Sequence, residues 1–115
     1  FSTAQPRPGD AKIYVHRISR SWDEEEANWY EASDGDDWSE EGGDFEDAFA
    51  DFQTTDEIEV WNKVAVTEYV KDAIEDPDNN FGLLLFMEVT MLTVEYASSE
   101  DDTKKNRPKL TLTMK

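Results

Sequence analysis

The chain of 115 residues has no cysteine, and its central part has no basic side chain. Without cysteine there is no disulfide framework, no thiol nucleophile and no thiolate zinc site. Residues 21–62 contain 17 Asp and Glu but no Lys or Arg, whereas the rest of the chain has 11 acids and 11 bases. The formal net charge of −17 therefore comes from one continuous block. Because nucleic acids and anionic membranes are both negatively charged, we predict that this protein binds neither.

Long hydrophobic runs are also missing. The longest, residues 81–87, is interrupted by Gly82 and is far shorter than the roughly 18–20 residues that a membrane span requires. A mean hydropathy of −0.79 together with high charge is typical of disordered chains. The four Trp, four Tyr and six Phe argue against disorder, because aromatic side chains bury large apolar areas. We therefore predict a single folded domain over residues 1–115.

Alternation of apolar and polar residues predicts an antiparallel β fold. We expect strands at residues 12–18, 48–52, 58–66, 81–87, 92–96 and 109–114. The apolar run 81–87, which contains no polar side chain, predicts a strand that is buried on both faces. One helix is expected at residues 67–75, with Thr67 as its N-cap and Pro77 just after its end; its expected buried face consists of Tyr69, Val70, Ala73 and Ile74. The fold class predicted from these elements is an all-β antiparallel sandwich with one short helix.

The segments before and after the first long strand are expected to be a turn with a strand stub and a long loop. Residues 1–11 contain Pro6, Pro8 and Gly9, which predicts a turn and the stub of a truncated strand. Residues 19–46 show no sustained period and many acids, so we expect a long acidic loop, anchored by Trp22, Trp29, Trp38 and Phe45. The number of strands is low for a closed sandwich, so we expect the sandwich to be incomplete.

Several segments resemble, in order, the DNRLRE domain, which is also called the disaggregatase-related repeat. They are residues 13–18, 19–24, 27–29, 42–45, 66–73, 80–85, 96–100 and 106–110. The resemblance implies a jelly-roll β-sandwich of the carbohydrate-binding kind, of which this chain would be the C-terminal two-thirds. It also implies a secreted or cell-surface location. The family's N-terminal strands have no counterpart here, so a neighbouring chain is an expected source of the missing strands.

Candidate carbohydrate-binding residues are Trp38 and a basic group near the end of the chain. Trp38 stands between acidic residues and is the tryptophan that we expect to be most exposed, whereas Trp22 and Trp29 match framework positions of the resembling family. The basic residues Lys104, Lys105 and Arg107, with Lys109, have the charge to hold an acidic polysaccharide. Two alternatives remain open, namely pairing with the acidic block of a neighbouring subunit and an ordinary solvated turn.

Candidate metal ligands lie in the acidic block, where Asp34, Asp36, Asp37 and Asp44 are the residues predicted to bind a structural calcium ion. Calcium prefers six to eight oxygen ligands, which clustered carboxylates can supply. The spacing is not that of an EF-hand loop. The alternatives are a solvated acidic surface and adaptation to a salty habitat, although salt adaptation would acidify the whole chain and not one block.

Catalytic signatures are weak, and we predict that the protein is not an enzyme. His16, the one histidine, lies in an expected strand and is read as an ordinary hydrogen-bonded side chain. No nucleophile motif or phosphate-binding loop is present. The predicted function is that of a non-catalytic extracellular module that binds polysaccharide or accompanies a larger secreted protein. The alternative is a structural surface or filament subunit, completed by strands from another chain and with cation-bridged acidic loops.

Overall fold

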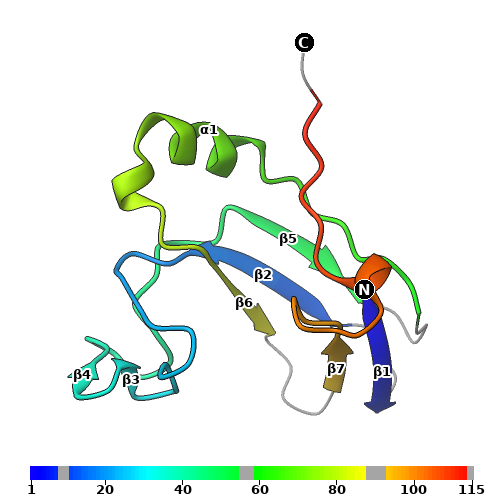
Figure 1. The fold of residues 1–115 in the computed structure, drawn as a ribbon, viewed down its shortest axis with the longest axis horizontal. Coiled ribbons are helices and arrows are strands. Elements are labelled where there is room, and N and C mark those ends of the chain that lie inside the picture. Colours follow the sequence, from blue (N-terminus) through cyan, green and yellow to red (C-terminus); the bar gives the residue numbers. More distant parts are fainter. Residues whose placement is uncertain (8–10, 55–58, 88–92, 114–115) are drawn as a thin grey trace.

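The centre of the fold is an antiparallel sheet of three strands, in the order β5, β2, β6 (Figure 1). This computed structural model describes residues 1–7, 11–54, 59–87 and 93–113. Within them the strands and helices are β1 (Ser2–Arg7), β2 (Lys12–Arg17), β3 (Glu31–Ser33), β4 (Asp36–Asp37), β5 (Ala50–Gln53), α1 (Thr67–Glu75), η1 (Pro77–Asn79), β6 (Leu83–Met87), β7 (Thr93–Tyr96) and η2 (Lys104–Asn106). The described chain is therefore a small β-rich fold of antiparallel sheets with one α-helix, as the sequence predicts at this coarse level.

β2 is the central strand because its alternate residues are β-branched and apolar. Ile13 and Val15 are 4% and 0% exposed, and Val15 pairs with Ala50 of β5 on one side and with Leu85 of β6 on the other. Such alternation buries one face of a strand and leaves its other face more polar. The predicted strands at residues 12–18 and 48–52 are thus confirmed, with small differences in their bounds.

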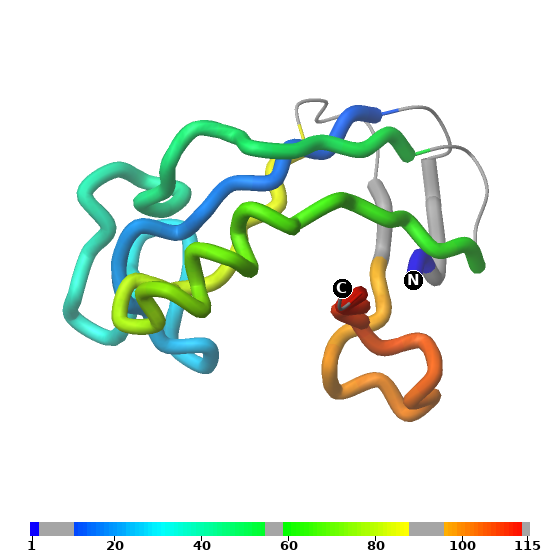
Figure 2. Tube along the Cα trace, turned by 90° about the horizontal axis from the view of Figure 1, so that it is seen from above, coloured from blue at the N-terminus to red at the C-terminus, as the bar shows by residue number. Residues whose placement is uncertain are grey.

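A second sheet consists of β1 and β7, which run antiparallel. Ser2 in β1 faces Tyr96 in β7, and the amide of Ser2 donates to the carbonyl of Val60 over 3.1 Å. The segment after residue 59 is therefore attached to the edge of β1. It then runs beside the three-stranded sheet towards α1 (Figure 2). Most of the predicted strand at 92–96 is present as β7, and Leu92 lies outside the described residues.

α1 spans residues 67–75 as predicted. It ends at Asp76 because the residue before a proline avoids the helical region, and Pro77 begins η1. The expected N-cap is wrong, since Val66 occupies the cap position and no side chain caps the helix. Ile74, expected on the buried face, is 74% exposed. Among the described helices, none is long and apolar enough to cross a membrane.

Two predicted strands do not appear in the described residues. Residues 59–66, the described part of the expected strand 58–66, form no strand, and Glu59 has a φ of 59°, which is incompatible with extended backbone. Residues 109–113 also form no strand, and residue 114 lies outside the described part. The expectation that 81–87 is buried on both faces is wrong as well, because Leu85 and Phe86 are 54% and 46% exposed on the edge strand β6.

The expected loop of residues 19–46 contains one feature that its sequence did not suggest. β3 and β4 form a short antiparallel hairpin, and Gly35 in its turn has a φ of 78°, which glycine adopts without steric cost. In residues 1–11, the described residues 1–7 contain the strand β1, and residues 8–10 lie outside the described part.

Candidate functional site

The loop of residues 19–46 is closed at its base beside the three-stranded sheet. Ile18 forms an isolated β-bridge with Phe45, and the amide of Ser19 donates to the carbonyl of Asp44 over 2.9 Å. The amide of Ile18 also donates to the carbonyl of Gly82 over 3.1 Å. Both ends of the loop are therefore fixed to the end of β2 and to the residues just before β6.

Short polar contacts hold the interior of this loop in one conformation. The Asn28 side-chain oxygen accepts hydrogen bonds from the amides of Tyr30 and Glu31 over 2.8 and 3.0 Å, which is an Asx turn. The amide of Asp23 donates to the carbonyl of Ala32 over 2.8 Å, and Ala32 is completely buried. A loop with this many internal hydrogen bonds can position side chains as a strand or helix does.

Three tryptophan side chains from this loop line a cavity of about 300 Å³. They are Trp22, Trp29 and Trp38, and the wall is continued by apolar side chains, among them Ile18, Leu83 and Leu84. Asp44 is the one charged residue among the described residues of the lining. The cavity is thus a largely apolar, aromatic hollow with a single carboxylate.

Each indole is fixed by its surroundings. Trp22 Nε1 donates to the carbonyl of Phe81 over 2.5 Å, and Trp38 Nε1 donates to the carbonyl of Asn28 over 2.8 Å. The ring of Trp29 lies against Gly42, whose amide donates to the Trp29 carbonyl over 2.7 Å. A Cβ at position 42 would come within 3.0 Å of Trp29 Cη2, so the sequence needs glycine there.

The exposure of the three rings corrects one expectation. Trp29 and Trp22 are 59% and 40% exposed, whereas Trp38 is more covered than either. The prediction that Trp38 is the most exposed tryptophan is therefore wrong. The resemblance placed Trp22 and Trp29 in a framework role, but both present ring surface to the cavity. In the sequence, the feature that indicates this site is the presence of three tryptophans in an otherwise acidic loop.

Arg20 is a site residue that the sequence reasoning missed. Its guanidinium pairs with the Asp36 carboxylate, lies 3.9 Å from Asp44 Oδ2 and stands 5.8 Å from the centroid of the Trp38 ring. It also donates to the carbonyl of Asp37 over 3.1 Å. The sequence feature that could have identified Arg20 is its position, since it is the last base before the acid-only block.

The backbone around Asp44 stabilises the charged form of its carboxylate. Its carboxylate accepts hydrogen bonds from the amides of Ser39 and Glu40, over 3.0 and 3.3 Å. The hydrogen bond from Ser39 is the largest cause of a lowered Asp44 pKa, and the amide of Glu40 and the charge of Arg20 add to it. Hydrogen bonds to the charged form favour ionisation, so the carboxylate in the cavity is an anion at neutral pH.

The predicted calcium ligands are only partly brought together. Arg20 contacts the carboxylates of Asp36 and Asp44, whereas it reaches Asp37 through the backbone. Asp34 lies exposed in the β3–β4 turn. Within the described residues, no three Asp, Glu or His side chains converge as a set that could hold a metal ion. Calcium binding stays a prediction.

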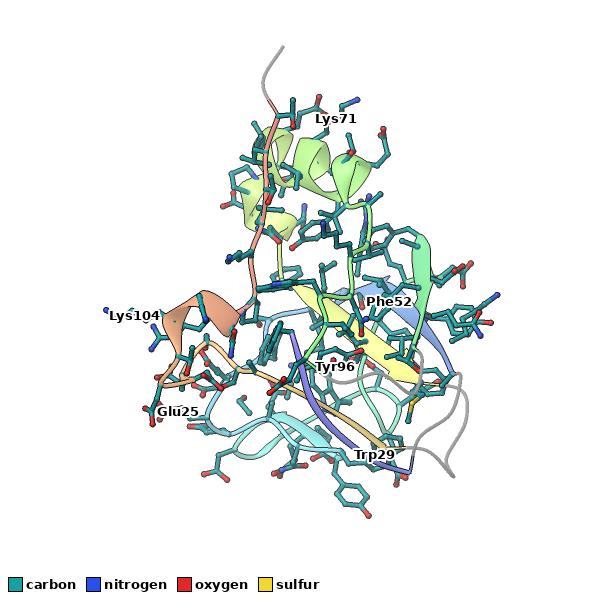
Figure 3. The ribbon with its side chains drawn as sticks, turned by 90° about the vertical axis from the view of Figure 1, so that its right-hand side faces the viewer. Glu25, Trp29, Phe52, Lys71, Tyr96 and Lys104 are labelled. Carbon is teal, nitrogen blue, oxygen red and sulfur yellow. The ribbon has the colours of Figure 1, made fainter. Side chains whose placement is uncertain are left out.

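The predicted basic residues lie in another part of the molecule. η2 and the β3–β4 hairpin are on opposite sides in both Figure 1 and Figure 2. Lys104 points outward from η2 (Figure 3), and Lys105 is exposed too. Arg107 Nε donates to the carbonyl of Asp101 over 2.8 Å. The structure therefore does not combine Trp38 with Lys104, Lys105 and Arg107 into one binding site.

No protein-family model matches this chain. No curated protein and no solved structure matches it either. Its function is therefore argued from the chemistry of the cavity.

A second cavity, of about 470 Å³, lies between the end of β2 and α1. It is more polar, and two of the charged groups in its wall, Arg17 and Asp72, pair with each other. Arg17 also packs near the rings of Phe49 and Tyr69. His16, in the neighbouring part of β2, has Nδ1 2.7 Å from the carbonyl oxygen of Glu46, in keeping with an ordinary hydrogen-bonded side chain. These contacts join α1 to the sheet, so we assign this region a structural role.

Proposed function

We propose that this protein is a non-catalytic module that binds a glycan in the tryptophan cavity. The observation that carries the proposal is the convergence of Trp22, Trp29 and Trp38 on one hollow of about 300 Å³. Indole rings offer large, flat apolar surfaces, and the C–H faces of a pyranose ring pack well against them. A hollow at the lower end of the size range for ligand sites suits one sugar unit of a longer chain.

Preorganisation supports the same function. The indole N–H groups of Trp22 and Trp38 are already bound to backbone carbonyls, and Gly42 packs against Trp29. A ligand would therefore meet rings that are already positioned, which reduces the entropy cost of binding. Glycan cleavage commonly uses two carboxyl groups on either side of the scissile bond, whereas Asp44 is the one acid among the described lining residues. This favours binding without catalysis.

We place this module in the jelly-roll class implied by the resemblance to the DNRLRE domain, and outside the cell or at its surface. The support is the order of the resembling segments along the chain, which include the tryptophan-bearing loop. In this proposal the antiparallel sheets β5–β2–β6 and β1–β7 are the two faces of a sandwich.

The test is calorimetric titration with a panel of neutral and charged oligosaccharides. Trp29→Ala removes the most exposed ring of the cavity and should weaken binding at least thirtyfold, the effect of losing a central aromatic contact. Trp61→Ala is the matched control, because Trp61 is 37% exposed and does not line the cavity. Absence of binding across the panel, or equal losses in both variants, would contradict the proposal.

A second candidate, a structural subunit that assembles with copies of itself, is favoured by the edge of β6. Within the described residues β6 pairs with β2 alone, and its exposed Leu85 and Phe86 carry no charge to discourage pairing. An edge of this kind can accept a strand from another chain. Calcium would bridge the acidic loops of adjoining copies in such an assembly.

Light scattering over a range of protein concentrations, with and without calcium, tests this second candidate. Assembly should be lost in Leu85→Lys, which places a charge on the exposed edge strand. A wild-type monomer at every concentration, unchanged by calcium or a chelator, would rule it out.

A further inference from the structure

We propose that the glycan held in the tryptophan cavity carries protonated amines, as an oligomer of glucosamine does. This inference rests on the proposed function and names the class of sugar. Two observations support it: the loop that forms the cavity is negatively charged, and the walls of the cavity are aromatic.

The loop that forms the cavity has almost no positive charge to offer an acidic sugar. Residues 19–46 contain twelve acids and one base, Arg20. The guanidinium of Arg20 is already engaged by Asp36 and Asp44. The loop that forms most of the cavity therefore has a large net negative charge, and its potential attracts cationic ligands and repels anionic ones.

The aromatic walls of the cavity also favour a positively charged ligand. The face of an indole ring is the negative end of its quadrupole and attracts ammonium and guanidinium groups. The loop already uses this attraction, since Arg20 stands 5.8 Å from the centroid of the Trp38 ring. A glucosamine unit could stack its ring on one indole while its ammonium group faces another, or faces Asp44 in the wall of the cavity.

The basic group at the other end of the molecule does not change this conclusion. Lys104 and Lys105 belong to η2, on the opposite side of the fold from the β3–β4 hairpin (Figures 1 and 2). At physiological ionic strength charges are screened over about 8 Å, so lysines at that end add little at the cavity. An acidic polysaccharide would thus meet the carboxylates of the loop without compensating bases.

The experiment compares four probes by calorimetry at pH 6: the β-1,4-linked hexamers of glucosamine and of N-acetylglucosamine, an oligogalacturonate of the same length, and hexalysine. The first two share a backbone and differ in charge. Hexalysine carries charge without a sugar ring, so it reports non-specific attraction to an acidic protein. Each titration is repeated with Trp29→Ala, with Trp29→Phe, which keeps an aromatic face, and with Trp61→Ala as the control.

We expect the glucosamine hexamer to bind at least tenfold more tightly than its acetylated counterpart, the galacturonate to show no binding, and the preference to shrink as salt is raised. Trp29→Ala should remove this binding, and Trp29→Phe should retain part of it. Equal or tighter binding of the acetylated or acidic oligomer overturns the inference but leaves glycan binding intact. Hexalysine binding as tightly as glucosamine, with no effect of Trp29→Ala, also overturns it. Failure of every oligosaccharide to bind overturns the proposed function itself.

Discussion

The two ends of this molecule contain similar residues but arrange them differently. In the loop of residues 19–46, Arg20 lies over Trp38, and at the other end Lys109 lies 4.8 Å from the centroid of Trp61. The loop adds two further indoles and holds them in place, Trp22 by a hydrogen bond to the carbonyl of Phe81 and Trp29 by packing against Gly42, so a cavity results. Trp61 instead packs against the ring of Phe1, 5.3 Å away between centroids. Aromatic and basic residues alone therefore do not make a site, because the rings must converge and be held.

The largest expected difference between the two ends is in stability. Trp22→Ala should lower the free energy of unfolding by roughly 3 kcal/mol, the lower end of the range for a tryptophan, because part of its ring is exposed. The substitution also removes the hydrogen bond that ties the loop to Phe81. Urea denaturation measures the effect.

Trp61→Ala provides the matched comparison, since Trp22 and Trp61 are 40% and 37% exposed. We expect a loss of about 1 kcal/mol for Trp61, whose contacts are a tilted ring and an exposed lysine. If the two variants were equally destabilised, Trp22 would be no more tightly integrated than Trp61, and the distinction between the two ends would fail.

The next largest effect comes from the glycine that supports Trp29. Gly42 has a φ of 95°, and a Cβ there would meet the indole at 3.0 Å, so Gly42→Ala should cost about 2 kcal/mol and displace the ring. Gly35→Ala separates strain from collision, since Gly35 has a φ of 78° but no atom within 4 Å of the added Cβ, and should cost about 1 kcal/mol. Thermal unfolding and tryptophan fluorescence measure both variants. Equal effects on fluorescence would show that Trp29 does not depend on close approach to Gly42.

The sequence predicts the parts of this fold that follow a local pattern. The strand at β2 follows from the alternation of Ile13 and Val15, and the end of α1 follows from Pro77. Residues 59–66 have similar alternation, yet Glu59 adopts a positive φ where its amide donates to the Ser2 carbonyl over 2.9 Å. That contact joins residues far apart in the chain, and alternation contains no information about it.

The candidate site was predictable in composition but not in geometry. The sequence identifies tryptophans in an acidic loop, and it places Arg20 just before that loop. It does not reveal that Trp38 turns its N–H to Asn28 and becomes the more covered ring, or that the hairpin of β3 and β4 folds back within the loop. The first feature depends on a hydrogen bond from the indole to a backbone carbonyl, and the second on hydrogen bonds between backbone groups. Because every residue type has a backbone carbonyl, the sequence does not show which one is used.

A smaller effect, which depends on pH, distinguishes the carboxylate in the cavity from an exposed carboxylate of the same loop. The Asp44 pKa is lowered in the folded state, chiefly by the amide of Ser39. The carboxylate therefore stabilises the fold above its unfolded pKa of about 4, and this contribution is lost as the pH falls through the lower, folded value. Asp44→Asn should be less stable than the wild type at pH 7, and the difference should vanish at strongly acidic pH. Melting temperatures from pH 7 to pH 2 measure this, with Asp34→Asn in the exposed turn as the control. A constant difference at all pH values would show that the charge of Asp44 is not what matters.

The smallest effect is expected at the basic end, where Lys104 projects from η2 (Figure 3) and Lys105 is exposed. Replacing both by alanine should change the free energy of unfolding by no more than about 0.5 kcal/mol, as is usual for exposed charges. It should also leave glycan affinity unchanged in calorimetry.

Arg20→Ala is the comparison at the cavity. It removes only one positive charge, but it leaves the carboxylates of Asp36 and Asp44 without the cation that they share. It should therefore alter both stability and affinity more than the double lysine variant, because the effect of a charge depends on what it faces. A loss of binding in the lysine variant alone would move the glycan site to η2.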